Sequence, residues 1–278
     1  MQNSLEKKHG QFTSKQLRVT QVLDKRGTSV AYMTEQEVAD EAKVSIATVS
    51  RCWALLGYMN FKEYKKAMKR KLEVTPENKL KNAVEEVQKQ DLLTNMVQKQ
   101  MNHLAETNQH VSREDFNEAV LLISRADPLF IFAPGPSESL GCLSQFRLSR
   151  LGVPVTVMPK SGHELFESMI HLSSRSVLLI FQFVQTLPET DVLVDYAKEV
   201  GCPVILVTDR LYSDLHRQTE STLFARRGEL WEFHSMVPPM MIIESLIVGI
   251  AMLLGEPAME KLELLSKVRK KYKAKIPK

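Results

Sequence analysis

The sequence predicts two domains, a small all-helical domain and an α/β domain with a parallel sheet flanked by helices. Short amphipathic segments with capping residues occupy positions 14–72. After residue 108, continuous apolar runs of strand length alternate with helical segments, which is typical of a parallel sheet covered on both faces. The net charge of +4 is uneven, because residues 1–78 hold 14 Lys and Arg against 9 Asp and Glu, and the remainder 23 against 24.

Residues 34–58 predict two short helices around a tight turn at Lys43 and Val44. Thr34 and Glu37 have the spacing of a capping box, and Ser45 is a natural N-cap for the second helix. Gly57 is expected to end it. The residues expected to face inward are Val38, Ala39, Ala42, Val49, Cys52 or Trp53, and Leu56. This arrangement indicates a helix-turn-helix, and an ordinary αα-hairpin is the alternative.

Polar residues on the second helix and lysines on the next helix are the candidate DNA contacts. A helix-turn-helix reads the major groove with the N-terminal residues of its second helix, so we expect base contacts from Thr48, Ser50 and Arg51. Arg51 could instead be a structural ion-pair partner. The lysines at 62, 65, 66 and 69 form a basic stripe, which is either a solvated surface or a phosphate contact. We expect phosphate contacts from Ser45, Lys62, Lys65 and Lys69.

Breaks in the pattern predict the domain boundaries. Pro76 ends the basic helix, so we expect a helix-turn-helix domain over 1–76, a helical linker over 77–107 and the α/β domain over 108–278. The first twelve residues are polar and are expected to be loose. A polar helix is predicted over 77–105, and its thin apolar stripe suits packing on a dimer partner, packing on the next domain, or an exposed connector.

The composition argues against several classes of protein. Apolar content of 44% and charged content of 25% are those of a globular chain. Cys52, Cys142 and Cys202 are far apart and lack metal-ligand spacing, so neither a disulfide framework nor a zinc site is expected. The N-terminus lacks a signal-peptide core, and the apolar run 240–254 is interrupted by Glu244 and is too short to span a bilayer. We expect a cytoplasmic protein with no metal, cofactor or membrane association.

The α/β domain is predicted to contain five strands. Strands are expected at 129–133, 153–158, 176–183, 203–208 and 221–225, and helices at 112–125, 139–151, 163–171, 189–200, 235–254 and 258–273. The helix at 235–254 is mostly apolar, which indicates burial in the core or in a dimer interface. On the last helix, Leu262, Leu265 and Val268 are expected to face inward.

Several motifs resemble the RpiR family of bacterial transcription regulators. Residues 44–51 read VSIATVSR, 56–58 read LGY and 61–65 read FKEYK, similar to the family pattern VSxATVxR…LGxxxFxEfK. In that family a helix-turn-helix precedes a SIS domain, the sugar-isomerase fold that commonly binds phosphosugars. The resemblance covers nearly the whole chain and implies a homodimer or homotetramer. It also implies that a small-molecule effector sets the affinity for a double-stranded DNA operator. Family members often have basic residues at 54 and 55, where this chain has Ala and Leu.

At the ligand site implied by the resemblance, the chain departs from the family motifs. The GxGxS turn reads APGPS at 133–137, and the SxSGxT motif reads FQFVQT at 181–186. Two prolines remove amide donors, phenylalanines replace hydroxyl donors, and Glu138 would repel an anion. We therefore expect a less charged ligand, an aromatic one, or a carboxylate held by Arg147 or Arg175. The expected lining residues are Gly135, Ser137, Ser139, Phe181, Phe183 and Thr186. Alternatively, the two phenylalanines fill the pocket and nothing binds.

Two other functions stay open at this point. A sugar-phosphate isomerase with an appended DNA-binding domain needs a general base beside a proton-carrying partner. His163 and Glu164 are the candidate pair, but adjacent helical residues point about 100° apart, so no catalytic residue is assigned. The other is a constitutive DNA-binding protein whose SIS domain only dimerises. Metabolite-dependent operator binding would separate this protein from the regulator, and turnover of a sugar phosphate would identify the enzyme.

Overall fold

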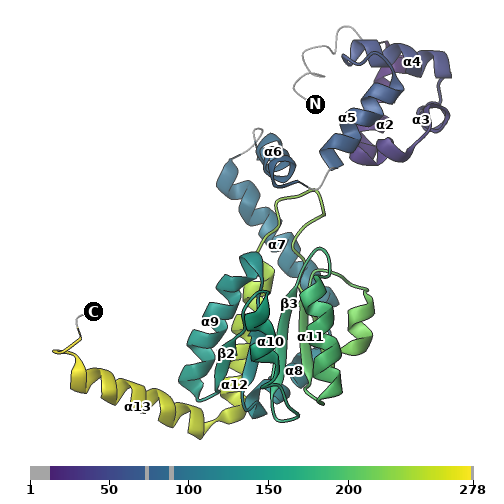
Figure 1. The fold of residues 1–278 in the computed structure, drawn as a ribbon. Helices are drawn as coiled ribbons and strands as arrows, with labels where there is room; N and C mark the ends of the chain where they lie inside the picture. The colour runs from purple at the N-terminus through teal and green to yellow at the C-terminus, as the bar shows by residue number, and fades with distance from the viewer. Residues whose placement is uncertain (1–12, 73–74, 88–90, 277–278) are drawn as a thin grey trace. The chain divides into compact units, whose positions relative to one another are not determined.

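The computed structural model describes residues 13–72, 75–87 and 91–276, so the polar segment 1–12 lies outside the described residues. The chain divides into two compact units, residues 1–90 with 229–233 and residues 91–228 with 234–278. The polar helix expected over 77–105 is interrupted, because α6 (Pro76–Val87) ends in the first unit and α7 (Leu92–His110) begins in the second (Figure 1). Asp91 caps α7 by accepting a hydrogen bond from the Thr94 amide at 2.8 Å, which starts a new helix there.

The first unit contains the two predicted short helices around a turn, with their caps. The Thr34 hydroxyl accepts from the Glu37 amide at 3.2 Å, and the Glu37 carboxylate accepts from the Thr34 amide at 2.6 Å, so the capping box is confirmed. Ser45 caps the second helix, and Gly57, at φ +88°, follows its end. A 3-10 helix joins the first helix to the pair. The elements are α2 (Ser14–Arg26), η2 (Gly27–Tyr32), α3 (Glu35–Ala42), α4 (Ile46–Leu55) and α5 (Phe61–Leu72).

Trp53 on α4 is the centre of the first unit's core. Its side chain is fully buried, and its ring centre lies 5.0 Å from that of Phe61 and 4.9 Å from that of Tyr64, both on α5. The indole N–H donates to Glu35 on α3 at 2.6 Å. One side chain therefore fixes α4 against both neighbouring helices, while Leu56, also expected inward, is only partly buried. This packing gives the second helix of the hairpin a defined orientation within its unit.

The second unit contains a five-stranded parallel sheet in the order β2-β1-β3-β4-β5. Every neighbouring pair is parallel, as the continuous apolar runs predicted. Since consecutive strands run the same way, the loops that follow them gather at one edge of the sheet, the carboxyl edge. The strands are β1 (Leu129–Phe132), β2 (Val155–Val157), β3 (Val177–Gln182), β4 (Val204–Thr208) and β5 (Ser221–Phe224).

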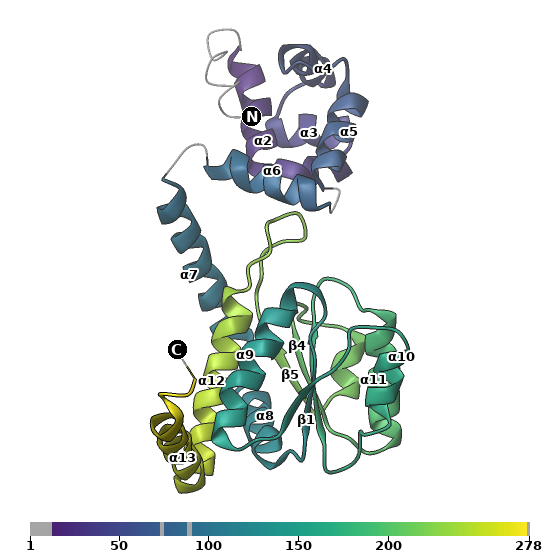
Figure 2. The same cartoon turned by 60° about the vertical axis from the view of Figure 1, so that its left-hand side comes forward.

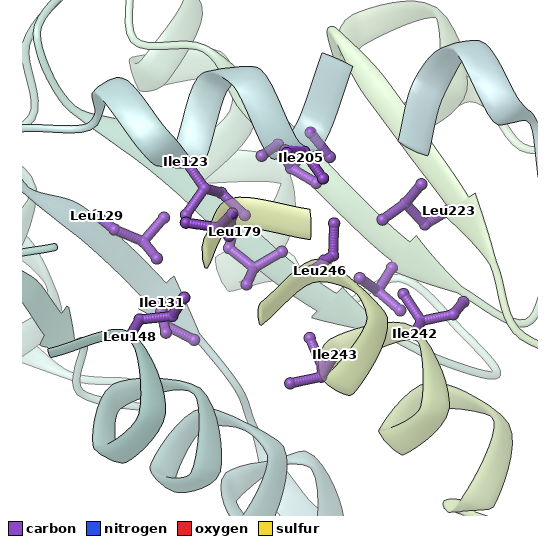
Figure 3. Packing of buried hydrophobic residues seen from close by; sticks show 14 of the residues in the cluster. Ile123, Leu129, Ile131, Leu148, Leu179, Ile205, Leu223, Ile242, Ile243 and Leu246 are labelled. Carbon is purple, nitrogen blue, oxygen red and sulfur yellow. The ribbon is translucent and has the colours of Figure 1, made fainter. Parts of the chain in front are cut away.

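Helices cover both faces of this sheet. Figure 2 shows α8 (Arg113–Arg125), α9 (Glu138–Leu148) and α12 (Val237–Leu254) on one side, and α10 (His163–Met169) and α11 (Pro188–Glu199) on the other. Alternate strand residues point to opposite faces, so Leu179 packs against Ile123 of α8 and Leu246 of α12 (Figure 3). Its neighbours on β3, Leu178 and Ile180, belong to the core beneath α10 and α11.

The two C-terminal helices differ in how far they are buried. In the described part of the chain, one helix, α12, is long and apolar enough to cross a membrane by length and composition alone. Its Ile242, Ile243, Leu246 and Ile250 are buried against the sheet and α8, as expected of a core helix. On α13 (Glu256–Tyr272), Leu262 and Leu265 are partly buried, but the expectation that Val268 faces inward is wrong, because it is 44% exposed.

Candidate functional site

The outward face of α4 carries the residues predicted to read bases. Ser50 and Arg51 are exposed, and Thr48 is half-buried with its hydroxyl 3.0 Å from that of Ser45. The Ser45 oxygen also accepts from the Thr48 amide at 3.3 Å, so this serine caps the helix. The Arg51 Nε donates to the Ala47 carbonyl at 3.1 Å, and among the described residues Arg51 makes no ion pair. The guanidinium therefore remains available to an outside partner.

The lysines on α5 are not equivalent. Lys62, Lys66 and Lys69 are exposed, and together with Lys65 they line a shallow concavity of about 760 Å³ that also includes Phe61. The Lys65 ammonium donates to the Met33 carbonyl at 2.9 Å and lies 5.4 Å from the Phe61 ring centre. Lys65 therefore fastens α5 to the end of η2, whereas the exposed lysines give this surface its positive charge.

The loop after β1 has a backbone turn but few donors. Gly135 is at φ +59°, Ser137 is buried, and the Ser139 hydroxyl donates back to the Pro136 carbonyl at 3.0 Å. Glu138, at the start of α9, forms an ion pair with Lys160 at 2.5 Å, and both side chains are about half exposed. The charge of Glu138, which was expected to repel an anion, is thus neutralised by Lys160, and the charge of Lys160 is neutralised by Glu138.

Residues 181–186, at the end of β3 and in the loop after it, stand where the resemblance places the SxSGxT motif. The two phenylalanines of this segment occupy different environments. Phe181 is 1% exposed and belongs to the core beneath α8 and α12. Phe183 is half-buried, and the Arg227 guanidinium carbon lies 4.3 Å from its ring centre. Thr186 is also half-buried. Of the predicted lining residues on this loop, the structure places Phe183 and Thr186 at the carboxyl edge and Phe181 in the core.

A tight turn holds this loop against the end of β4. The Gln185 amide donates to the Phe183 carbonyl at 2.8 Å, and Val184, between them, is in the left-handed region at φ +66°. The Val184 amide donates to Oδ1 of Asp209 at 2.9 Å. Gln182, buried at the end of β3, accepts from the Thr190 hydroxyl at 2.5 Å. The amide of Val184 therefore already has an anionic partner from the chain itself.

Arg227, after β5, is the buried cation at this edge. Its side chain is 7% exposed, its Nε donates to the Ser235 carbonyl at 3.0 Å, and its Nη1 lies 3.6 Å from Oδ2 of Asp209. Burial lowers the pKa of Arg227, and the nearby Asp209 carboxylate raises it. A distance of 3.6 Å is longer than a hydrogen bond, so Arg227 and Asp209 interact here through charge.

Comparisons with known proteins identify the fold of the second unit. Residues 122–249 match the family described as SIS domain. The second unit has the α/β fold of that family. Solved structures with this fold include the sugar isomerase domain of an RpiR transcription factor from Sphaerobacter thermophilus, 23% identical with a TM-score of 0.60, covering 64% of this chain and 99% of that one. No curated protein matches the chain.

Two further structures extend the comparison. The Vibrio vulnificus NanR protein complexed with ManNAc-6P is 19% identical, with a TM-score of 0.57 over 95% of this chain and 96% of that one. A putative sugar-phosphate isomerase from Listeria monocytogenes is 14% identical, with a TM-score of 0.52 over 58% of this chain and 88% of that one. At these identities the likeness shows the fold, which regulators and putative enzymes share.

The structure places Arg147 and Arg175, the two expected partners of a ligand carboxylate, away from the carboxyl edge of the sheet. Arg175 precedes β3, and its carbonyl accepts from the Asp127 amide just before β1, so it lies at the amino edge of the sheet. Arg147 is in the last turn of α9, which runs back toward the start of β2. Neither can hold a ligand carboxylate at the carboxyl edge. The sequence signal for Arg227 was its place directly after the predicted fifth strand, at 221–225.

Proposed function

We propose that this chain is a transcription regulator of the RpiR type, in which the first unit binds double-stranded operator DNA. The observation that supports this proposal is a pair of capped short helices around a turn, with Ser50 and Arg51 exposed on the second, in one chain with a SIS-type fold. In this proposal Thr48, Ser50 and Arg51 read bases, while Ser45, Lys62 and Lys69 contact phosphates. Lys65 contributes chiefly by positioning α5, because its ammonium is bound to Met33.

We further propose that the SIS domain binds a small effector that sets the affinity for DNA, and that this effector is not a typical phosphosugar. A phosphate needs amide and hydroxyl donors together with positive charge. Here the loop after β1 contains two prolines, and the hydroxyl of Ser139, in the first turn of α9, donates to the Pro136 carbonyl. In the loop after β3, the Val184 amide donates to Asp209. Gly135, Ser137, Ser139, Phe183 and Thr186 remain the proposed lining.

The assembly and the absence of enzymatic chemistry are also part of this proposal. Exposed apolar side chains on α12, including Val248 at 59% and Met252 at 79% exposure, suit an interface in a cytoplasmic homodimer or homotetramer. His163 and Glu164 begin α10 as adjacent exposed residues, so their side chains diverge by about 100°. That arrangement does not support an acid–base pair for sugar isomerisation.

The test is a gel-shift series with duplexes tiled across the region upstream of the protein's own gene, with and without a metabolite extract. We expect one duplex to bind more tightly than the rest and the extract to change that affinity. Binding to no duplex under either condition refutes the regulator. Binding that the extract never changes identifies a constitutive DNA-binding protein, and turnover of a sugar phosphate by the purified protein identifies an enzyme.

A further inference from the structure

Three loops at the carboxyl edge of the SIS sheet converge on one carboxylate. Asp209 directly follows β4, Val184 lies two residues after β3, and Arg227 lies three residues after β5. The Val184 amide donates to Oδ1 of Asp209 at 2.9 Å, and Nη1 of Arg227 lies 3.6 Å from Oδ2. One backbone donor and one cation thus face the same carboxylate from either side.

The backbone at Val184 is held in a costly conformation by these contacts. A β-branched residue at φ +66° is a rare outlier, because its Cβ crowds the backbone in the left-handed region. This turn leaves one amide for an anion, that of Val184, because the Gln185 amide donates to the Phe183 carbonyl. Here the amide points at an anion supplied by the chain, and the Asp209 side chain is only 11% exposed. The one amide that this turn presents is therefore occupied by a carboxylate of the chain itself.

Two other cations near this edge are also paired, whereas Arg210, beside Asp209, is exposed. Lys160 contacts Glu138 at 2.5 Å, and Arg226 lies 3.3 Å from Glu106. Arg227 is the most buried cation of the group and stacks on Phe183, which holds its guanidinium in place. A ligand anion would have to displace Asp209 or accept its negative charge at close range. The charge of Asp209 thus disfavours a phosphate or carboxylate at the position that faces the Val184 amide and Arg227.

We propose that Val184 and Arg227 form an oxyanion site that Asp209 fills, and that Asp209 is the specificity-determining residue that restricts the SIS domain to uncharged ligands. The ligand class rests on the proposed function, since it concerns the effector. The filled oxyanion site does not, because it concerns contacts within one domain. Removing the Asp209 carboxylate leaves the amide and the guanidinium to bind an external oxyanion.

The experiment measures binding of inorganic phosphate to the full-length protein by calorimetry and thermal shift. The variants are D209A, D209A/R227Q and R210Q, with sodium chloride at matched ionic strength as the solution control. R210Q is the matched surface control, because Arg210 is the exposed cation next to Asp209. We expect D209A to bind phosphate at least tenfold more tightly than the wild type. We expect D209A/R227Q to lose that gain and R210Q to behave as the wild type does.

Several results would overturn the proposal. Wild-type protein that binds phosphate as tightly as D209A shows that Asp209 excludes nothing, and folded D209A without tighter binding shows that no site was filled. If D209A folds only in the presence of phosphate, the proposal is supported. If D209A does not fold at all, D209N preserves the side-chain shape and removes the charge, and it must bind phosphate more tightly than the wild type.

A second experiment tests the class of ligand, and its outcome can be told apart from a failure of the proposed function. A thermal-shift series compares uncharged sugars with sugar phosphates and sugar acids on the wild-type protein. Stabilisation by an uncharged sugar supports the inference, and stabilisation by an acid or a phosphate refutes the ligand class. None of these measurements uses DNA. A D209A gain in phosphate binding by a protein that ignores every duplex would therefore uphold the filled site and refute the regulator.

Discussion

The exposed lysines of α5 allow a quantitative test of DNA binding that needs no knowledge of the operator. We consider the double variant K62Q/K69Q, which removes two exposed positive charges from one helix, and compare it with K65Q on the same face. Lys62 and Lys69 are exposed, whereas the Lys65 ammonium donates to the Met33 carbonyl at 2.9 Å. The three substitutions are chemically identical, so the comparison isolates what each ammonium contacts.

The expected magnitude follows from counterion release. Each lost phosphate contact reduces the slope of log affinity against log salt by about 0.9 on duplex DNA. Two lost contacts reduce it by about 1.8, which makes the ratio between affinities at 50 and 200 mM salt roughly 12-fold smaller. K65Q removes a charged hydrogen bond inside the unit, so we expect it to lower the free energy of unfolding by about 1–2 kcal/mol. Its effect on the salt slope should be smaller than that of either exposed lysine.

Fluorescence anisotropy with a labelled duplex, repeated across that range of salt, measures the slope for each variant. A random-sequence duplex suffices, because phosphate contacts do not depend on sequence. Urea denaturation of each variant separates a loss of binding from a loss of folding. An unchanged slope in K62Q/K69Q would show that this helix face is merely solvated. If only K65Q reduces the slope of log affinity against log salt, the contact of Lys65 with Met33 does not persist on DNA.

Three further substitutions test the stability of individual elements. S45A removes the N-cap of α4 and should lower the free energy of unfolding by about 1 kcal/mol, measured by urea denaturation. Hydrogen bonds from Thr34 lower the pKa of the Glu37 carboxyl, so the ionised carboxylate stabilises the fold above the unfolded pKa near 4.5. This stabilisation is lost as the pH falls through the folded pKa. We therefore expect E37Q to flatten the dependence of the unfolding free energy on pH below about pH 5. G249A should destabilise by about 1–3 kcal/mol in thermal unfolding, because a Cβ there lies 2.9 Å from a side-chain carbon of α8. An unchanged melting temperature would contradict the close approach of α8 and α12.

The two capped helices of the first unit and the order of strands and helices could be predicted because their signals are short-range. A cap acts over three residues, as at Thr34 and Ser45, and strand burial is visible in runs such as 177–182. Periodicity identifies the apolar face of a helix but not the length over which a partner covers it. Val268 therefore has the right spacing and yet is exposed on α13.

The contacts that define the candidate sites could not be predicted from the sequence, because they join residues that no spacing pattern connects. The Lys65 ammonium reaches the carbonyl of Met33 across 32 positions, so a lysine in a basic stripe can have a structural partner. No pattern predicts a left-handed valine at 184, which is stable only because surrounding contacts fix it. Arg227 could have been chosen from its place after a strand, but its pairing with Asp209 depends on how two loops meet.

Phe181 and Phe183, which stand where the motif of the resembled family has serines, occupy separate environments. Strand alternation sends Phe181 into the core with Leu179, so its ring replaces packing volume and cannot line a site. Phe183 lies beyond the end of β3, where its face supports the Arg227 guanidinium at 4.3 Å. The departure from the phosphate motif thus did not remove positive charge from this edge of the sheet. It left a buried arginine whose nearest anion, Asp209, is internal, and an external anion can use that arginine only where Asp209 is removed.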